Sequence, residues 1–162
     1  MTRRTVPGAL LALSLLLPLA ACGDDSDSAS SSSEVSTDLG TAPKIPASEE
    51  EAPTELVIED VVVGDGAEAE AGDVVEVKYV GGFPETGEEF DSSWKGGENN
   101  TFEVQLGAGG VIEGFDRGIT GMKEGGRRMV TMPSDLGYGS QANGSIPADS
   151  TLTFIIDLVE VS

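Results

Sequence analysis

Polar and apolar residues alternate along much of the chain after residue 55, with the two-residue period of a strand that buries one face. Within 73–80, for example, Val75 and Val77 alternate with Glu76 and Lys78. Five segments show this alternation or a run of β-branched residues: 56–63, 73–80, 101–106, 128–132 and 151–161. Glycine-rich connections separate them, so we expect five strands.

A helix is expected at only one place, residues 115–119, after Gly114 and before Gly121. A helix this short is not stable alone, so packing against the strands must hold it. Strands with one short helix indicate an α+β fold, in which an antiparallel sheet wraps around the helix. The 107 residues from 56 to 162 suit one domain.

The N-terminus has the pattern of a lipoprotein signal peptide, residues 1–21. Arg3 and Arg4 precede an apolar run that ends in Leu-Ala-Ala-Cys at 19–22. The run is too short to span a membrane and closes with small residues. Its end resembles a bacterial lipobox, in which the cysteine, here Cys22, is lipidated and becomes residue one. The alternative is an ordinary secretory peptide with an unmodified cysteine. Cys22 is the only cysteine in the chain, so no internal disulfide forms.

Residues 22–55 form an acidic block rich in Ser and Pro, with few large apolar side chains: Val35, Leu39 and Ile45. Such a segment buries too little surface to offset its chain entropy. We therefore predict a disordered tether between the lipidated Cys22 and the domain. The expected location is the extracytoplasmic face of a bacterial cell membrane, with attachment through the N-terminal lipid only.

Acidic residues greatly outnumber basic ones. The chain has 29 Asp and Glu against 9 Lys and Arg, a net charge of −20. Such an excess argues against binding nucleic acid or anionic headgroups through a basic patch. Solubility is the simpler explanation of the charge, and a preference for basic clients is the alternative.

Several classes of catalytic site are missing from the sequence. The chain has no histidine, which excludes histidine-based triads and histidine metal sites. The glycine-rich run 107–110 lacks the lysine of a phosphate-binding loop. Ser92, Ser93 and Ser134 have no basic partner in sequence. Hydrolase chemistry is therefore poorly supported, and we expect no metal and no cofactor.

Four short runs supply aromatic and aliphatic side chains suited to an apolar pocket: Val-Lys-Tyr-Val-Gly at 77–81, Glu-Phe-Asp-Ser-Ser at 89–93, Val-Ile-Glu-Gly-Phe at 111–115 and Leu-Gly-Tyr-Gly at 136–139. With the run Gly-Gly-Arg-Arg-Met-Val-Thr-Met-Pro at 125–133, they resemble the FKBP-type peptidyl-prolyl cis/trans isomerases. The resemblance extends from about Asp60 to Ser162 and implies the FKBP-like form of the expected fold.

The resemblance implies isomerisation of Xaa–Pro bonds in exported proteins, with macrolide inhibitors as further ligands and no cofactor. We expect a monomer. A catalytically weak chaperone or binding module of the same fold is the alternative. A substrate-binding lipoprotein of a transporter is a third candidate, but 107 residues are too few for its two lobes.

The resemblance also implies roles for single residues. Tyr79 is the pocket tyrosine, Asp91 a polar contact and Phe115 the floor under the proline ring. The backbone N–H of Ile112 holds a substrate carbonyl, and the hydroxyl of Tyr138 bonds the substrate backbone. The remaining substrate-binding positions are apolar: Phe90, Phe102, Val111, Ile146 and Phe154.

Some positions differ from the family's common pattern. Phe115 stands where the best-known members have tryptophan, and Val104 where many have a third aromatic residue. The phenylalanines on alternating strands also suit a plain hydrophobic core. Trp94, alone in a polar glycine-rich loop, suits either partial packing or contact with a client.

Overall fold

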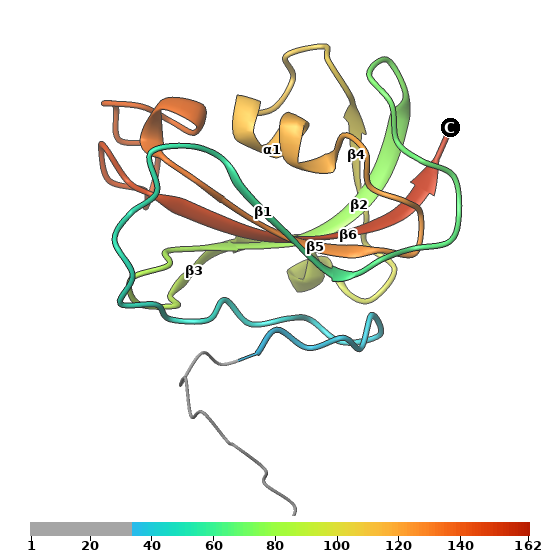
Figure 1. The fold of residues 1–162 in the computed structure, drawn as a ribbon, viewed down its shortest axis with the longest axis horizontal. Helices are drawn as coiled ribbons and strands as arrows, with labels where there is room; N and C mark the ends of the chain where they lie inside the picture. The colour runs from blue at the N-terminus through green and yellow to red at the C-terminus, as the bar shows by residue number, and fades with distance from the viewer. Residues whose placement is uncertain (1–33) are drawn as a thin grey trace, which may run out of the picture. The chain divides into compact units, whose positions relative to one another are not determined.

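One α-helix lies across one face of an antiparallel sheet in the computed structural model, which describes residues 34–162 (Figure 1). The strands are β1 (Val57–Val62), β2 (Val74–Gly82), β3 (Glu89–Ser92), β4 (Phe102–Gln105), β5 (Arg127–Met132) and β6 (Leu152–Val161). The helices are α1 (Glu113–Ile119) and two short 3-10 helices, η1 (Ser93–Gly96) and η2 (Ser134–Leu136). The α+β fold predicted from the sequence is confirmed.

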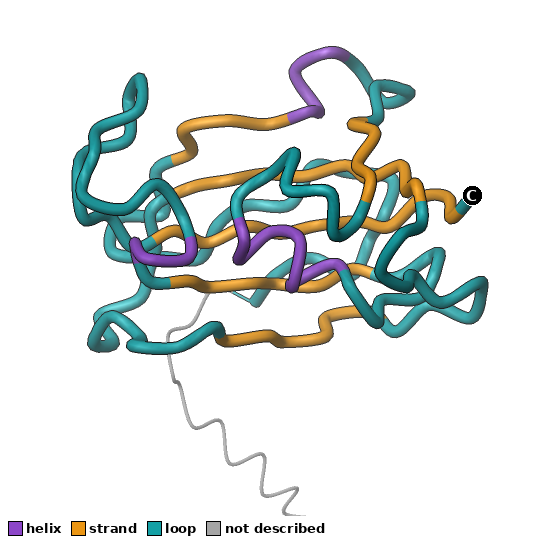
Figure 2. Tube along the Cα trace, turned by 90° about the horizontal axis from the view of Figure 1, so that it is seen from above, coloured by secondary structure: helices purple, strands orange, loops and turns teal. Residues whose placement is uncertain are grey.

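Strand β2 has two different partners along one of its edges. The sheet order is β1-β5-β6-β2-β3, and β4 also pairs with β2. Residues 74–77 of β2 pair with β4, whereas residues 80–82 pair with β3. Between these stretches, the amide of Tyr79 donates to the Ser93 hydroxyl at 2.9 Å. β3 and β4 thus pair with different stretches of one edge of β2, and Tyr79 stands at the division between them. Figure 2 shows the strands of the sheet side by side, with a helix lying across them.

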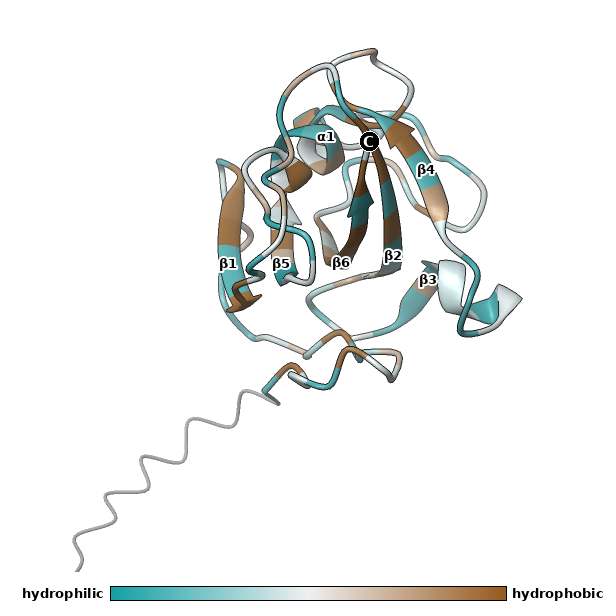
Figure 3. Ribbon diagram, turned by 90° about the vertical axis from the view of Figure 1, so that its right-hand side faces the viewer, coloured by the Kyte–Doolittle hydropathy of each residue, from teal (hydrophilic) through white to brown (hydrophobic). Residues whose placement is uncertain are grey.

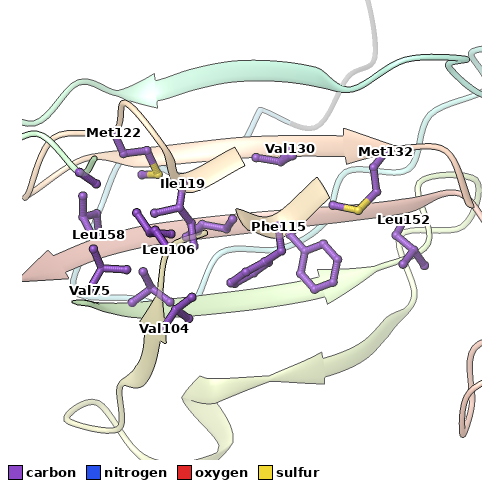
Figure 4. Close-up of a cluster of buried hydrophobic side chains, with 14 of the residues drawn as sticks. Val75, Val104, Leu106, Phe115, Ile119, Met122, Val130, Met132, Leu152 and Leu158 are labelled. Atoms are coloured by element: carbon purple, nitrogen blue, oxygen red, sulfur yellow. The ribbon is translucent and has the colours of Figure 1, made fainter. Parts of the chain in front are cut away.

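Two glycines bring α1 close to β5. A Cβ on Gly118 would lie 2.8 Å from a Val130 methyl, and one on Gly114 would collide with the side chain of Met132. These glycines are four residues apart and so share one face of the helix. Side chains from α1 and the sheet fill the space beside them (Figure 4), among them Val75, Leu106, Phe115, Ile119, Val130 and Leu158.

Arg128 fixes the end of α1. Its guanidinium donates to the carbonyls of Gly118 at 3.0 Å and Thr120 at 3.3 Å, where helical carbonyls lack partners. Its Nε also bonds a carboxylate oxygen of Asp60 in β1 at 2.6 Å. One side chain from β5 thus links the edge strand to the helix.

The predicted elements match the observed ones with small shifts. All five predicted strands are present. The helix begins at Glu113, two residues earlier than predicted, because the Ile112 carbonyl already accepts from the amides of Phe115 and Asp116. Strand β3 was not predicted, since its four residues are too few to show alternation. It forms because β2 offers it an edge.

The part of the expected tether that the structure describes lies against the domain. Residues 34–55 contain no helix or strand. Residues 35–48, called the strap below, run along the face of the sheet opposite α1 (Figures 1 and 3). Pro43 is buried, and Ile45 is only 6% exposed. The structure thus gives the strap fixed contacts where the sequence predicted a free tether. The predicted signal peptide, the predicted lipidation site Cys22 and the part of the predicted tether up to residue 33 lie outside the described residues.

Candidate functional site

A cavity of about 390 Å³ opens between the N-terminal end of α1 and the division in β2. Ten residues line it: Tyr79, Phe90, Asp91, Phe102, Gly110, Val111, Ile112, Phe115, Tyr138 and Phe154. All but Gly110 are among the ten site residues named from the sequence. They come from six separate segments of the chain, and the fold brings them around one opening.

Phe115 and Phe154 form the base of the cavity. They are 4% and 5% exposed, and their ring centroids lie 5.2 Å apart at an interplanar angle of 77°. Phe115 projects from α1, while Phe154 comes from the central strand β6. Tyr79 meets the ring of Phe115 edge to face at 5.6 Å. Such perpendicular contacts are a preferred aromatic geometry, so the three rings hold one another in place.

The wall beside this base depends on Gly81. Phe90 contacts Phe154 edge to face at 5.6 Å. A Cβ on Gly81 would lie 2.7 Å from the ring of Phe154 and 2.9 Å from that of Phe90. Only glycine lets both rings pack directly against the backbone of β2. Gly81 belongs to a sequence run noted for Tyr79, but its steric role appears only in the structure.

Tyr79 and Asp91 form the polar part of the cavity. The Tyr79 hydroxyl donates to a carboxylate oxygen of Asp91 at 2.7 Å. The other carboxylate oxygen accepts from the Ser92 amide at 2.8 Å, which fixes the carboxylate. Burial, followed by the hydrogen bond to Asp91 and its negative charge, raises the pKa of Tyr79 well above its ordinary value. The phenol therefore stays protonated at neutral pH and acts as a donor.

The Ile112 amide stands where the chain enters α1. Ile112 is the N-cap residue with extended backbone angles, φ −61° and ψ 146°. Its carbonyl accepts from the first amides of the helix, those of Phe115 and Asp116. No backbone carbonyl within residues 34–162 accepts from its N–H. The Gly107 amide donates to the Asp116 carboxylate at 2.8 Å and so ties the preceding loop to the helix. This loop brings Gly110, which the sequence gave no reason to select, to the cavity edge.

Phe102 and Tyr138 stand at the rim. They are 40% and 36% exposed, more than the rings at the base. Phe102 contacts Tyr79 at 5.7 Å between centroids, and Tyr138 follows η2. The cavity therefore has a buried apolar base and an open aromatic rim. A small apolar ring fits the base, while the chain that carries it stays outside.

Three residues singled out from the sequence lie elsewhere. Ile146 is 6% exposed in the hydrophobic core and does not line the cavity. It is held in a turn by two backbone hydrogen bonds with Asn143, both 2.9 Å. Val104 is also a core residue, 3% exposed. Trp94 packs beside Val80 and Ile155 on the strap side of the sheet, which favours partial packing over a client contact.

The described residues show neither a metal centre nor a membrane span. Within residues 34–162, no three potential metal-ligating side chains gather in one place. No helix in this part of the chain is long and apolar enough to cross a bilayer. The residues that line the cavity supply apolar surface, hydrogen-bond donors and the Asp91 carboxylate.

Comparison with known proteins assigns this arrangement to a family. A family model for FKBP-type peptidyl-prolyl cis-trans isomerases matches residues 66–159. A probable FK506-binding protein of Corynebacterium glutamicum is 51% identical over 108 residues, 67% of this chain and 88% of the relative. The FK506-binding protein of Streptomyces anulatus is 49% identical over 113 residues, 68% of this chain and 90% of its own.

The solved structure of AtFKBP13 has a TM-score of 0.60 and 35% identity, and the match covers 66% of this chain and 93% of that one. The sequence and structural matches agree. The chain therefore belongs to the FKBP-type peptidyl-prolyl cis-trans isomerase family.

Proposed function

We propose that the cavity isomerises Xaa–Pro bonds without a covalent intermediate, by stabilising the twisted amide. One observation carries the proposal: an almost fully buried aromatic base lies beneath an open rim, with hydrogen-bond donors at its edge. The proline ring occupies the base against Phe115 and Phe154. The peptide leaves through the rim between Phe102 and Tyr138.

The reaction needs little chemistry beyond this. The planar amide is held by a rotational barrier of about 18–20 kcal/mol. Twisting reduces both the resonance and the dipole of the carbonyl, so water stabilises the planar ground state more than the transition state. A dry cavity removes that difference. A 10⁴-fold acceleration needs roughly 5–6 kcal/mol, which desolvation, shape and one or two hydrogen bonds together are able to supply.

Each polar group has one role in this proposal. The Ile112 amide donates to a substrate carbonyl, and the Tyr138 hydroxyl bonds the substrate backbone. The Tyr79–Asp91 pair holds the Tyr79 ring in place and supplies the only charge among the cavity-lining side chains. No group takes up or releases a proton during the twist.

The proposed setting is the outside of a bacterial cell. Leu-Ala-Ala-Cys at 19–22 supports lipidation of Cys22 and attachment to the extracytoplasmic face of the membrane. The clients are then proline-containing segments of exported proteins, and the enzyme acts as a monomer.

The test is an isomerisation assay on residues 34–162 with a short proline-containing peptide, by a protease-coupled or NMR exchange method. We expect catalysis far above the spontaneous rate. Phe83→Ala serves as the control for cavity variants, because Phe83 packs beside Phe90 at 5.2 Å but does not line the cavity. A folded protein that binds the peptide without accelerating exchange would support the alternative of a catalytically weak chaperone.

A further inference from the structure

The strap covers part of the face of the sheet opposite α1, away from the catalytic cavity. The surface that it covers is called the strap site below. Ile45 fills its apolar part, against Val80 and Ile155, which are 1% and 0% exposed. Met129 and Trp94 pack beside this cluster. A Cβ on Gly82 would lie 2.8 Å from the Ile45 side chain, so glycine leaves the room that Ile45 takes.

The polar contacts that hold the strap all involve its main chain. Arg127, 0% exposed, donates to the carbonyls of Ser36 at 2.6 Å and Thr41 at 3.1 Å. The amide of Ser48 donates to the carbonyl of Pro84 at 2.8 Å. The Arg127 guanidinium also donates two hydrogen bonds to the carboxylate of Asp157, at 2.5 Å and 2.7 Å, which hold it in position. Main-chain recognition does not depend on side-chain identity, so other chain segments are able to satisfy the same contacts.

The strap has the chemistry of the proposed substrates. It contains two Xaa–Pro bonds, Ala42–Pro43 and Ile45–Pro46, within a segment that forms neither helix nor strand. Pro43 and Ile45 are buried while the intervening Lys44 is exposed. The strap site thus accommodates a proline-containing segment with an apolar anchor.

Two features make the strap replaceable. Only Pro43 and Ile45 are buried within it, whereas ordering its residues costs conformational entropy at every position. The polar contacts between the strap and the rest of the domain use only the strap's main chain, which a client segment also has.

We propose that the strap site is a second binding site for proline-containing polypeptide, occupied in cis by the strap and open to a client segment when the strap leaves. The client class rests on the proposed function, but the site does not use the catalytic cavity. A client held on one face raises the effective concentration of its other prolines near the cavity on the other.

Trp94 reports on the strap site, because it is the only tryptophan in the chain and packs against the cluster that contains Ile45. The experiment uses residues 34–162 with Ile45→Asp, which places a charge in the apolar cluster and releases the strap. The matched region makes up 90% of the Streptomyces anulatus protein, so that relative consists of little more than this domain. We expect a shift of Trp94 emission to longer wavelength with unchanged turnover of a short peptide.

A synthetic peptide of residues 34–48 is then titrated into the Ile45→Asp protein. It should bind saturably and reverse the emission shift. A peptide with Ile45→Asp, and one with both Pro43→Ala and Pro46→Ala, should each bind at least about tenfold more weakly. A reduced, carboxymethylated, proline-containing protein should displace a labelled wild-type peptide.

The proposal is wrong if the wild-type peptide does not bind, or if the unfolded protein does not displace it. It is also wrong if the peptide inhibits turnover without moving Trp94 emission, because the peptide then occupies the catalytic cavity. Should Ile45→Asp not fold, residues 49–162 replace it. If neither folds, the strap is a fixed part of the domain and not an exchangeable occupant. Peptide binding in a protein without isomerase activity would count against the proposed function instead.

Discussion

The hydroxyl of Tyr79 lies 2.7 Å from the carboxylate of Asp91, although the two residues sit on different strands and Tyr79 is packed among phenylalanine rings. The bond joins β2 to β3 next to the point where β2 changes partners. It places a fixed anionic group at the edge of an otherwise apolar cavity. The Tyr79 ring cannot turn away from Phe115 without breaking this bond.

This pair predicts how the protein behaves at high pH. The pKa of Tyr79 is raised in the folded state, so the unfolded chain loses that proton first, near pH 10. The stability linked to Tyr79 is therefore fully present below about pH 10 and declines as the pH rises above it. Urea unfolding at several alkaline pH values measures this decline.

The Tyr138→Phe protein allows the titration itself to be followed, because the chain has only two tyrosines. We expect the phenolate absorbance of Tyr79 to appear at a higher pH when folded than in denaturant. Adding Asp91→Asn should lower the pKa of Tyr79 only in part, because burial is the larger cause of the shift. Identical titration curves in the folded and unfolded protein would contradict the buried position of the phenol.

Phe115→Ala should remove the base of the cavity. The expected loss in catalytic efficiency exceeds about tenfold, which corresponds to 1.4 kcal/mol or more. Because the side chain is only 4% exposed, its removal should also lower the free energy of unfolding by about 3–5 kcal/mol. The assay is therefore run where the mutant is folded, with Phe83→Ala as control. Near-normal turnover would show that the proline ring sits elsewhere.

Tyr138→Phe removes one hydroxyl from the rim. We expect a loss of about 0.5–1.5 kcal/mol in transition-state stabilisation, the net value of one hydrogen bond. Stability should hardly change, since the ring is 36% exposed. Peptide kinetics and thermal unfolding measure the two effects separately. Unchanged activity with a large drop in melting temperature would make Tyr138 a structural residue.

Turnover should be nearly constant between about pH 6 and 8 and unaffected by chelators. The chain has no histidine to titrate in this range, and the proposed twist moves no proton. Initial rates across this range, with and without a chelator, test both points. A bell-shaped profile or strong inhibition by the chelator would mean that another mechanism operates.

Cys22→Ala should separate the anchor from the enzyme. We expect the variant to lose membrane attachment or to accumulate with its signal peptide uncleaved, while residues 34–162 isomerise a soluble peptide as fast as the anchored protein. Cell fractionation followed by the peptide assay distinguishes these results. Processed Cys22→Ala protein that stays on the membrane would argue against lipidation, and a folded but inactive domain would assign part of the site to the membrane.

The sequence by itself predicted much of the fold, because local patterns carry that information. The alternation in the first half of β2 reflects one more deeply buried face, and such periodicity is visible without any knowledge of neighbours. In β6 the alternation locates the strand, but the folded domain buries residues 152–158 on both faces. Nine of the ten cavity-lining residues were also named from the family resemblance. Seven of the nine lie in the four short runs, where each run keeps a side chain and its backbone setting together, and the other two, Phe102 and Phe154, lie on predicted strands.

What only the tertiary structure decided depends on contacts between distant residues. Ile146 lies next to a proline in sequence but faces the core, because a turn with Asn143 directs it there. Gly110 reaches the cavity through the path of its loop. The strap looks like free tether in sequence, and it gains its contacts only because Arg127 and the Val80–Ile155 surface meet on the far face of the sheet. The local sequence shows which side chains of a segment need to be buried. Only the folded domain determines where the surface that buries them lies.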